Sequence, residues 1–172
     1  MTFQLRFPSS QVSHWAGQYP NRYNDAPIIR IGAEAQARGS LTRDEFLAIT
    51  EWKTKRSKSR CRKNSESFVR EVTSCALTST EPRLKIEVLR LLDGVEWATA
   101  SVILHFCDEQ RWPILDFRAF WSLQMPAPTV CDFALWEAYV EHTRRLADEL
   151  AVDMRTLDKA LWSYSEANQP PS

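Results

Sequence analysis

Apolar residues recur every three or four positions along most of the chain after residue 25, as they do on the buried face of an amphipathic helix. Phe46, Ile49 and Trp52 form one such stripe, and Ile86 and Leu89 belong to another. The chain has only four glycines, which argues against a turn-rich β architecture. The pattern predicts an all-α protein of about seven to eight helices, which begin near residues 26, 42, 65, 81, 95, 116, 132 and 153.

Polar residues that can cap helices precede most of these stripes. Thr42 and Glu45 have the spacing of a capping box, in which each side chain bonds the backbone N–H of the other residue. Gly39 follows the first stripe, where a left-handed residue ends many helices. Further N-caps are expected at Asp25, at Asn64 or Ser65, at Thr80 with Pro82 in the first turn, and at Asp116, Asp132 and Asp153.

The two ends of the chain lack such a stripe. Residues 1–25 predict an irregular segment, and residues 168–172 a disordered tail. With 172 residues, 44% of them apolar, the chain is expected to form one domain over residues 1–172, or two small lobes that share a cleft. The first segment is rich in rings that either anchor it to the core or line a pocket: His14, Trp15, Tyr19 and Tyr23.

Charge is distributed unevenly although the formal net charge is zero. Residues 1–80 carry thirteen Lys and Arg against seven Asp and Glu, whereas residues 81–172 carry nine against fifteen. Such an excess of cations is typical of a surface that contacts a phosphate backbone, and it is also compatible with a solvated loop between helices. Seven cations lie within residues 53–63, here called the basic segment: Lys53, Lys55, Arg56, Lys58, Arg60, Arg62 and Lys63.

Residues 86–107 predict a helical hairpin. An apolar helix ends at a Gly94-Val95 turn, and a second apolar helix begins immediately afterwards. A hairpin of this kind directs backbone N–H groups outward, where they can hold a phosphate. After a short loop, Asp116 stands at the start of a third helix, in the position of an N-cap.

This arrangement resembles the helix-hairpin-helix superfamily of DNA glycosylases. Their hairpin reads roughly Leu-Pro-Gly-Val-Gly-x-x-Thr-Ala, and a catalytic Asp follows it in a Pro-x-x-Asp context. Asp116, three residues after Pro113, matches the catalytic Asp at a spacing that is usual for the superfamily. The resemblance covers about residues 86–123, and its hairpin matches are Leu92, Gly94, Val95, Thr99 and Ala100.

The resemblance implies a glycosylase-like helical bundle with a cleft, and a DNA glycosylase that flips a modified base out of the duplex and leaves an abasic site. Asp116 would stabilise the positive charge that develops on the deoxyribose and would orient or deprotonate a water molecule. Ala98 occupies the position of the Schiff-base lysine in the lyase-active members, so this chain looks monofunctional. Glu96 replaces the second hairpin glycine and brings an acid near the phosphate site.

The expected contacts with DNA come from the basic segment, from Arg118 and from the hairpin residues Gly94, Val95, Glu96, Trp97, Ala98 and Thr99. The expected base pocket includes His14, Trp15, Tyr19, Tyr23 and His105. Each of these residues also has a structural interpretation. Asp116 can serve only as a cap, His105 and Trp97 can be core residues, and Arg118 can pair with an acid. A DNA-binding hairpin module without catalysis and a helical scaffold in a multiprotein complex are therefore the alternatives.

No cofactor is expected, apart from a monovalent cation that a hairpin of this type can hold. Cys61, Cys75, Cys107 and Cys131 are 14, 32 and 24 residues apart, unlike the clustered cysteines of the iron–sulfur members, so reduced buried thiols are expected. Neither a signal peptide nor a membrane span is recognisable, which predicts a cytoplasmic location. We also expect a monomer. The expected partner is double-stranded DNA. Modified phage DNA is one form of this partner. If the enzyme excises the bulky or hypermodified cytosines of such DNA, its role is antiviral.

Overall fold

The computed structural model describes residues 3–126, 128 and 130–170, and every regular element within these ranges is a helix. The all-α class is therefore confirmed. The described chain contains ten α-helices and the short 3-10 helix η1 (Ser9–Gln11), more than the expected seven to eight. It forms two compact units, a terminal unit of Met1–Tyr23 with Pro113–Ser172 and a central unit of Asn24–Trp112.

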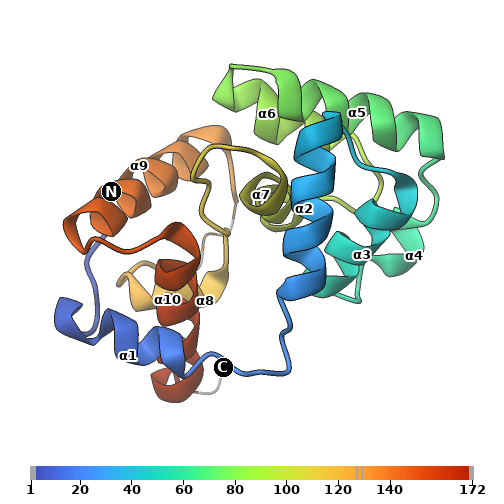
Figure 1. Ribbon diagram of the computed structural model, residues 1–172. Helices are drawn as coiled ribbons and strands as arrows, with labels where there is room; N and C mark the ends of the chain where they lie inside the picture. The colour runs from blue at the N-terminus through green and yellow to red at the C-terminus, as the bar shows by residue number, and fades with distance from the viewer. Residues whose placement is uncertain (1–2, 127, 129, 171–172) are drawn as a thin grey trace. The chain divides into compact units, whose positions relative to one another are not determined.

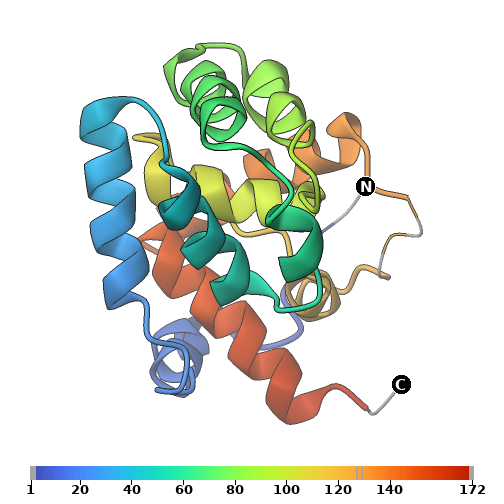
Figure 2. The same ribbon diagram turned by 90° about the vertical axis from the view of Figure 1, so that its right-hand side faces the viewer.

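The central unit is built around α7 (Trp97–Cys107), the most apolar helix of the chain. Eight of its eleven residues are buried, and it contacts α2, α3 and α6. The helices α5 and α6 lie side by side, as both views show (Figures 1 and 2). In chain order, the other helices of this unit are α2 (Ala26–Arg38), α3 (Arg43–Lys53), α4 (Lys58–Cys61), α5 (Glu66–Thr78) and α6 (Pro82–Leu89).

A buried ion pair joins α6 to the end of α7. Lys85 and Asp108 pair with side chains that are only 3% and 4% exposed. The Lys85 ammonium also donates to the carbonyls of Ala76 and Leu77, at 3.2 Å each, in the last turn of α5. Lys85 therefore satisfies carbonyl groups that have no partner within their own helix and ties three helices of the central unit together.

The terminal unit is organised around α10 (Met154–Asn168), which contacts the other helices of the unit. Met154, Leu157 and Leu161 are on its buried face, at the spacing that the sequence predicted. The N-terminal segment joins this unit through hydrogen bonds from the backbone N–H groups of Gln4 and Arg6 to carbonyls at the end of α8 (Phe117–Ser122). The other helices are α1 (Val12–Gly17), α8 (Phe117–Ser122) and α9 (Phe133–Glu149).

Several local predictions are confirmed at the level of single hydrogen bonds. Thr42 and Glu45 form the capping box at the start of α3, and Ser65 caps α5. Gly39 ends α2 with a left-handed φ of 77°. Asp116, Asp132 and Asp153 each accept a backbone N–H as the N-caps of α8, α9 and α10.

Other local predictions are wrong. The segment 1–25 is not irregular throughout, because η1 and α1 lie within it. Asp25 begins α2 without a side-chain capping bond, and the N-cap of α6 is Glu81 rather than Thr80. The expected tail from residue 168 begins inside α10, whereas residues 171–172 lie outside the described residues.

Candidate nucleic-acid interface

The predicted hairpin is formed by α6, a turn over residues 90–96, and α7. Gly94 adopts a φ of 84°, a conformation that L side chains rarely tolerate, and the N–H of Val95 donates to the Leu92 carbonyl at 3.1 Å. Glu96 is the N-cap of α7, but its side chain makes no capping bond. The first turn of α7 therefore presents backbone N–H groups that the Glu96 side chain does not occupy.

The hairpin turn contacts the basic segment directly. A Cβ atom added to Gly94 would lie 2.8 Å from the Cys61 sulfur and 3.1 Å from the Arg60 Cβ, so the turn packs on α4 without space for a side chain. Asn64 closes the contact through two hydrogen bonds. Its Oδ1 accepts from the Asp93 N–H at 2.9 Å, and its Nδ2 donates to the Asp93 carbonyl at 3.0 Å. The structure thus brings the hairpin and the basic segment together within the central unit.

The basic segment combines a turn between α3 and α4, the short helix α4 and a second turn after it. Lys53 ends α3, and α4 begins at Lys58. Lys58 pairs with Glu51 at 2.9 Å, so this cation is partly neutralised by its own unit. The exposed cations of the segment are Lys55, Arg56, Arg60, Arg62 and Lys63.

Trp97 is a core residue of the hairpin. It is 6% exposed, and the Arg90 guanidinium lies 4.6 Å from the centre of its ring. Its position does not suit a side chain that inserts between bases. The Glu96 side chain is 68% exposed and points an acid toward solvent at the turn. Leu91, which the sequence analysis did not single out, is the exposed apolar residue of the turn, at 64%.

Asp116 belongs to the terminal unit, so the structure places it in a different unit from the hairpin. Its Oδ1 accepts the N–H of Arg118 at 2.9 Å, and the residue is half-buried. The loop before it is held at Ile114, whose N–H lies 3.3 Å from both carboxylate oxygens of buried Asp158. The hydroxyl of Tyr139 donates to the Ile114 carbonyl at 3.1 Å. Both backbone groups of Ile114 are therefore fixed two residues before Asp116.

Tyr139 lies in an acidic, water-excluded environment. Burial raises the pKa of the Tyr139 hydroxyl well above its ordinary value, and the charges of Asp158 and Asp116 raise it further. The hydroxyl therefore stays protonated and remains a donor to Ile114. This donor helps to keep the loop that carries Asp116 in one conformation.

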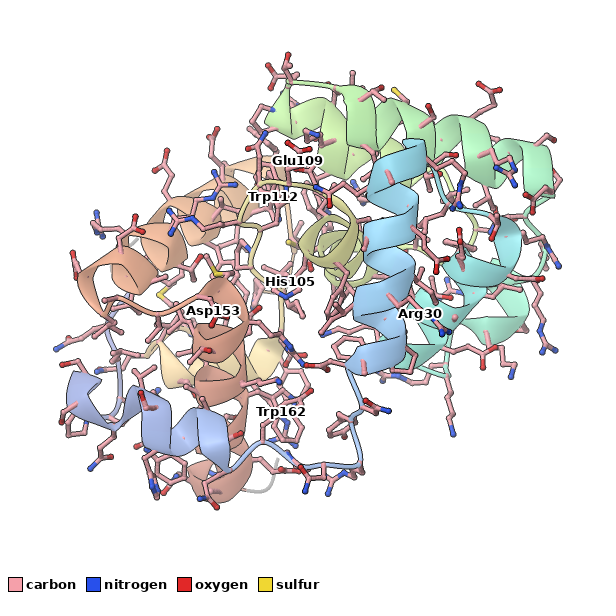
Figure 3. All side chains as sticks on the ribbon, in the orientation of Figure 1. Arg30, His105, Glu109, Trp112, Asp153 and Trp162 are labelled. Atoms are coloured by element: carbon pink, nitrogen blue, oxygen red, sulfur yellow. The ribbon has the colours of Figure 1, made fainter. Side chains whose placement is uncertain are left out.

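Aromatic residues of the expected base pocket gather in the terminal unit. The centroids of Tyr19, Tyr23 and Trp162 lie 5.3–5.6 Å from one another. Trp162 projects from α10 (Figure 3). It was not predicted as a pocket residue, because its position along the helix is the only signal that the sequence offers. Arg118 lies over this ring, with its Cζ 5.0 Å from the ring centre. Arg118 therefore contacts Trp162, and its N–H contacts Asp116.

The other expected pocket residues take structural positions. Trp15 packs edge-on against Tyr164, with a centroid distance of 5.2 Å, and its Nε1 donates to Gln11 at 3.2 Å. His14 is exposed next to Trp15. His105 is a residue of the central unit on α7 (Figure 3), where its Nδ1 lies 2.6 Å from the Trp112 carbonyl. The five expected pocket residues are thus divided between the two units.

The cysteines form no disulfide. Cys61 and Cys107 are buried as expected, whereas Cys75 and Cys131 are only partly buried. Burial raises the pKa of the Cys107 thiol to about 12, with smaller contributions from Glu45 and Asp108. Within residues 3–126, 128 and 130–170, no group of three or more His, Cys, Asp or Glu side chains is placed to hold a metal ion. No helix in the described part of the chain is long and apolar enough to cross a membrane.

Comparison of the chain with protein-family models, with curated proteins and with solved structures found no match.

Proposed function

We propose that this protein is a monofunctional DNA glycosylase that holds duplex DNA with its helical hairpin and uses Asp116 in base excision. The observation that carries the proposal is the contact between the hairpin turn and the basic segment. Gly94 packs on Cys61, and Asn64 bonds both backbone groups of Asp93. This contact places the hairpin turn and the start of α7 beside the exposed cations of the basic segment, and N–H groups at a helix start together with cations suit a phosphate backbone.

The chemistry assigned to Asp116 follows from the charge that base excision creates. Breaking the N-glycosidic bond leaves positive charge on the deoxyribose, and a carboxylate close to the sugar stabilises it and orients water. Asp116 has support on both sides, from the first turn of α8 and from the fixed backbone of Ile114. A carboxylate on such a rigid backbone does not need to be repositioned during the reaction. Ala98 offers no amine, so the product is an abasic site with intact strands.

The second candidate is a DNA-binding module without catalysis. It is favoured by the bond from Asp116 to the Arg118 N–H, because an Asp that caps a helix needs no further role. The two candidates share the hairpin surface and differ only in what Asp116 does. A variant that keeps the cap but removes the carboxylate separates them.

The decisive experiment measures base release. Duplexes that contain alkylated, deaminated, hydroxymethylated or glucosylated bases, including phage DNA, are incubated with the protein and then treated with alkali to cleave abasic sites. Wild type is expected to cleave at least one of these substrates, and bulky modified cytosines are the first choice. Asp116→Asn and Asp116→Ser are expected to abolish release, because neither carries a charge to stabilise the sugar cation. Serine retains an oxygen that can cap α8.

The matched control is Asp132→Asn, which removes the charge from another N-cap of the terminal unit. It is expected to release bases at the wild-type rate. Equal activity of wild type and both Asp116 variants, or no release by wild type from any substrate, would leave the DNA-binding module as the function. Loss of activity with loss of the folded state would assign Asp116 a structural role, and thermal unfolding of each variant detects this outcome.

The hairpin surface is tested by its salt dependence. Replacing Lys53, Arg56, Arg60 and Lys63 by Gln is expected to weaken binding to all duplex sequences alike. The slope of log K against log salt should flatten by about 0.9 for each phosphate contact that is lost. Replacing the exposed cations Arg30 and Arg83, which lie outside the basic segment of the same unit, is the matched control. An unchanged slope in the basic-segment variant would show that these cations do not contact DNA.

A further inference from the structure

The terminal unit carries a surface in which cations lie over aromatic rings. We name this surface the aromatic–cationic platform. Its rings are mutually in contact, and each cation lies 4.9–5.5 Å from a ring centre: Arg155 and Lys159 over Tyr19, Arg22 over Tyr23, and Arg118 over Trp162. The platform consists of Tyr19, Tyr23, Trp162, Arg22, Arg118, Arg155 and Lys159.

The members of the platform come from three separate parts of the sequence. Tyr19, Arg22 and Tyr23 follow α1, Arg118 lies in α8, and the others lie on α10. Contacts of α10 with both α1 and α8 bring these parts together. All three rings are partly exposed rather than buried in the core, so part of each ring is accessible from solvent.

Arg118 is the most informative member. Its Cζ lies 5.0 Å from the Trp162 ring centre and 5.5 Å from that of Phe117, which is 56% exposed. Among the described residues, its guanidinium has no hydrogen-bond or ion-pair partner. The guanidinium is a planar group whose donors suit phosphate oxygens, and its contacts with two rings restrain its position.

The acids near the platform are already engaged. Glu166 pairs with Arg22 at 2.8 Å, and buried Asp158 accepts the Ile114 N–H. Side-chain hydrogen bonds and the charges of Tyr23 and Glu166 raise the pKa of Arg22, which stays cationic. Arg22 is therefore partly neutralised by Glu166, whereas the Arg118 guanidinium lies over the Trp162 ring and brings positive charge and an aromatic ring to the same place.

We propose that the aromatic–cationic platform binds a single-stranded polynucleotide, with unstacked bases against the rings and phosphates at the cations. A duplex does not fit this chemistry, because its base faces are already covered by their neighbours, whereas every unpaired base offers a face that stacks on an aromatic side chain. Arg118 holds the phosphate next to the base that stacks at Trp162. The platform belongs to the terminal unit and the hairpin to the central unit, and the binding does not depend on base release.

The test measures fluorescence anisotropy of labelled single strands, dT12 and U12, over a salt series. Wild type is expected to bind both, because stacking does not read the sugar, and a preference would identify the natural strand. Trp162→Leu should weaken binding roughly 5- to 100-fold at each salt concentration without a change of slope. Trp162→Phe retains a ring and should recover most of the affinity. Arg118→Gln should instead flatten the salt slope by about 0.7, the value for one phosphate of a single strand.

The matched controls separate stacking from charge. Arg145→Gln removes an exposed cation from α9 in the same unit and should leave binding unchanged. A 12-mer of abasic sites has the phosphates of dT12 without its bases, and it should bind wild type at least as weakly as dT12 binds Trp162→Leu, because it offers no base to any of the three rings.

Equal binding of dT12 and the abasic strand would overturn the proposal, because it would reduce the platform to a polyanion site. Wild-type affinity in a folded Trp162→Leu would overturn it as well. Loss of dT12 binding only in the variant of the basic segment would assign the strand to the central unit. None of these probes contains a modified base, so failure of base release and failure of this proposal are distinguishable.

Discussion

Asn64 and Asp93 exchange two hydrogen bonds across the start of the hairpin turn. The Asn64 side chain donates to the Asp93 carbonyl at 3.0 Å and accepts the Asp93 N–H at 2.9 Å, as a neighbouring strand would. Asn64 is buried and also donates to the Cys61 carbonyl at 2.9 Å. A single amide therefore connects the end of the basic segment to the turn whose N–H groups face the proposed phosphate.

Asn64→Ala is expected to destabilise the protein by about 1–3 kcal/mol, because both backbone groups of Asp93 lose their partner in a partly buried position. Urea unfolding measures the loss. Asn64→Asp retains the acceptor but turns a carboxylate oxygen toward the Cys61 and Asp93 carbonyls in a buried position, so its cost should be at least that of Asn64→Ala. Equal stability of all three proteins would show that water replaces the amide.

Gly94→Ala is expected to cost about 1–3 kcal/mol in stability, because the residue combines a positive φ with a closely packed α carbon. Its new Cβ would lie 2.8 Å from the Cys61 sulfur and 3.0 Å from the Cys61 nitrogen. Gly17→Ala is the matched control, since nothing lies within 4 Å of its added Cβ and its helical backbone accepts alanine. Duplex binding should fall in Gly94→Ala alone. Wild-type DNA affinity in that variant would separate the turn geometry from DNA binding.

Lys85→Met is expected to destabilise the central unit by about 3–5 kcal/mol, because it leaves a buried carboxylate without its cation. Asp108→Asn should be costly for the converse reason. The double variant Lys85→Met/Asp108→Leu should lose less than the two single losses together, since it leaves no buried charge. Arg83→Ala is the control, because the Arg83–Glu87 pair is exposed and is worth less than about 1 kcal/mol. Additive losses at Lys85 and Asp108 would contradict a coupled pair.

His142 is expected to make stability depend on pH. Burial lowers the pKa of its imidazole below 6.5, and the charge of Arg145 lowers it further. The unfolded chain then binds this proton more readily than the folded chain, so stability falls as pH falls through 6.5 and reaches its lower limit below the folded pKa. Thermal unfolding between pH 8 and pH 5 measures the change. His142→Gln should remove this contribution, and an identical pH profile would assign the dependence to other groups.

Borohydride should trap no covalent adduct at the hairpin with abasic DNA, because Ala98 carries no amine that can form a Schiff base. Gel mobility after reduction measures the adduct. Strand cleavage should appear only after heat or alkali. A strong adduct in wild type would identify another amine, and the monofunctional assignment would then be wrong.

Features that depend on one or two turns of helix could be predicted from the order of the residues. The helical stripes, the Thr42–Glu45 capping box and the left-handed Gly39 depend on residues close to one another along the chain, so their spacing predicts them directly. The hairpin is of the same kind, because its two apolar helices and its glycine turn are contiguous. The short helices α1 and α4 were missed, since neither is long enough to show a period.

Contacts between residues far apart in the chain could not be predicted and became visible in the folded protein. Asn64 is 29 residues from Asp93, and Lys85 is 23 residues from Asp108. Trp162 meets Tyr19 only because α10 packs on α1, and the burial of Trp97 was not distinguishable from a surface role. Local periodicity reports that a face is apolar but not which partner covers it. The partner is selected by the packing of whole helices, in which shape and buried polar groups must be satisfied together.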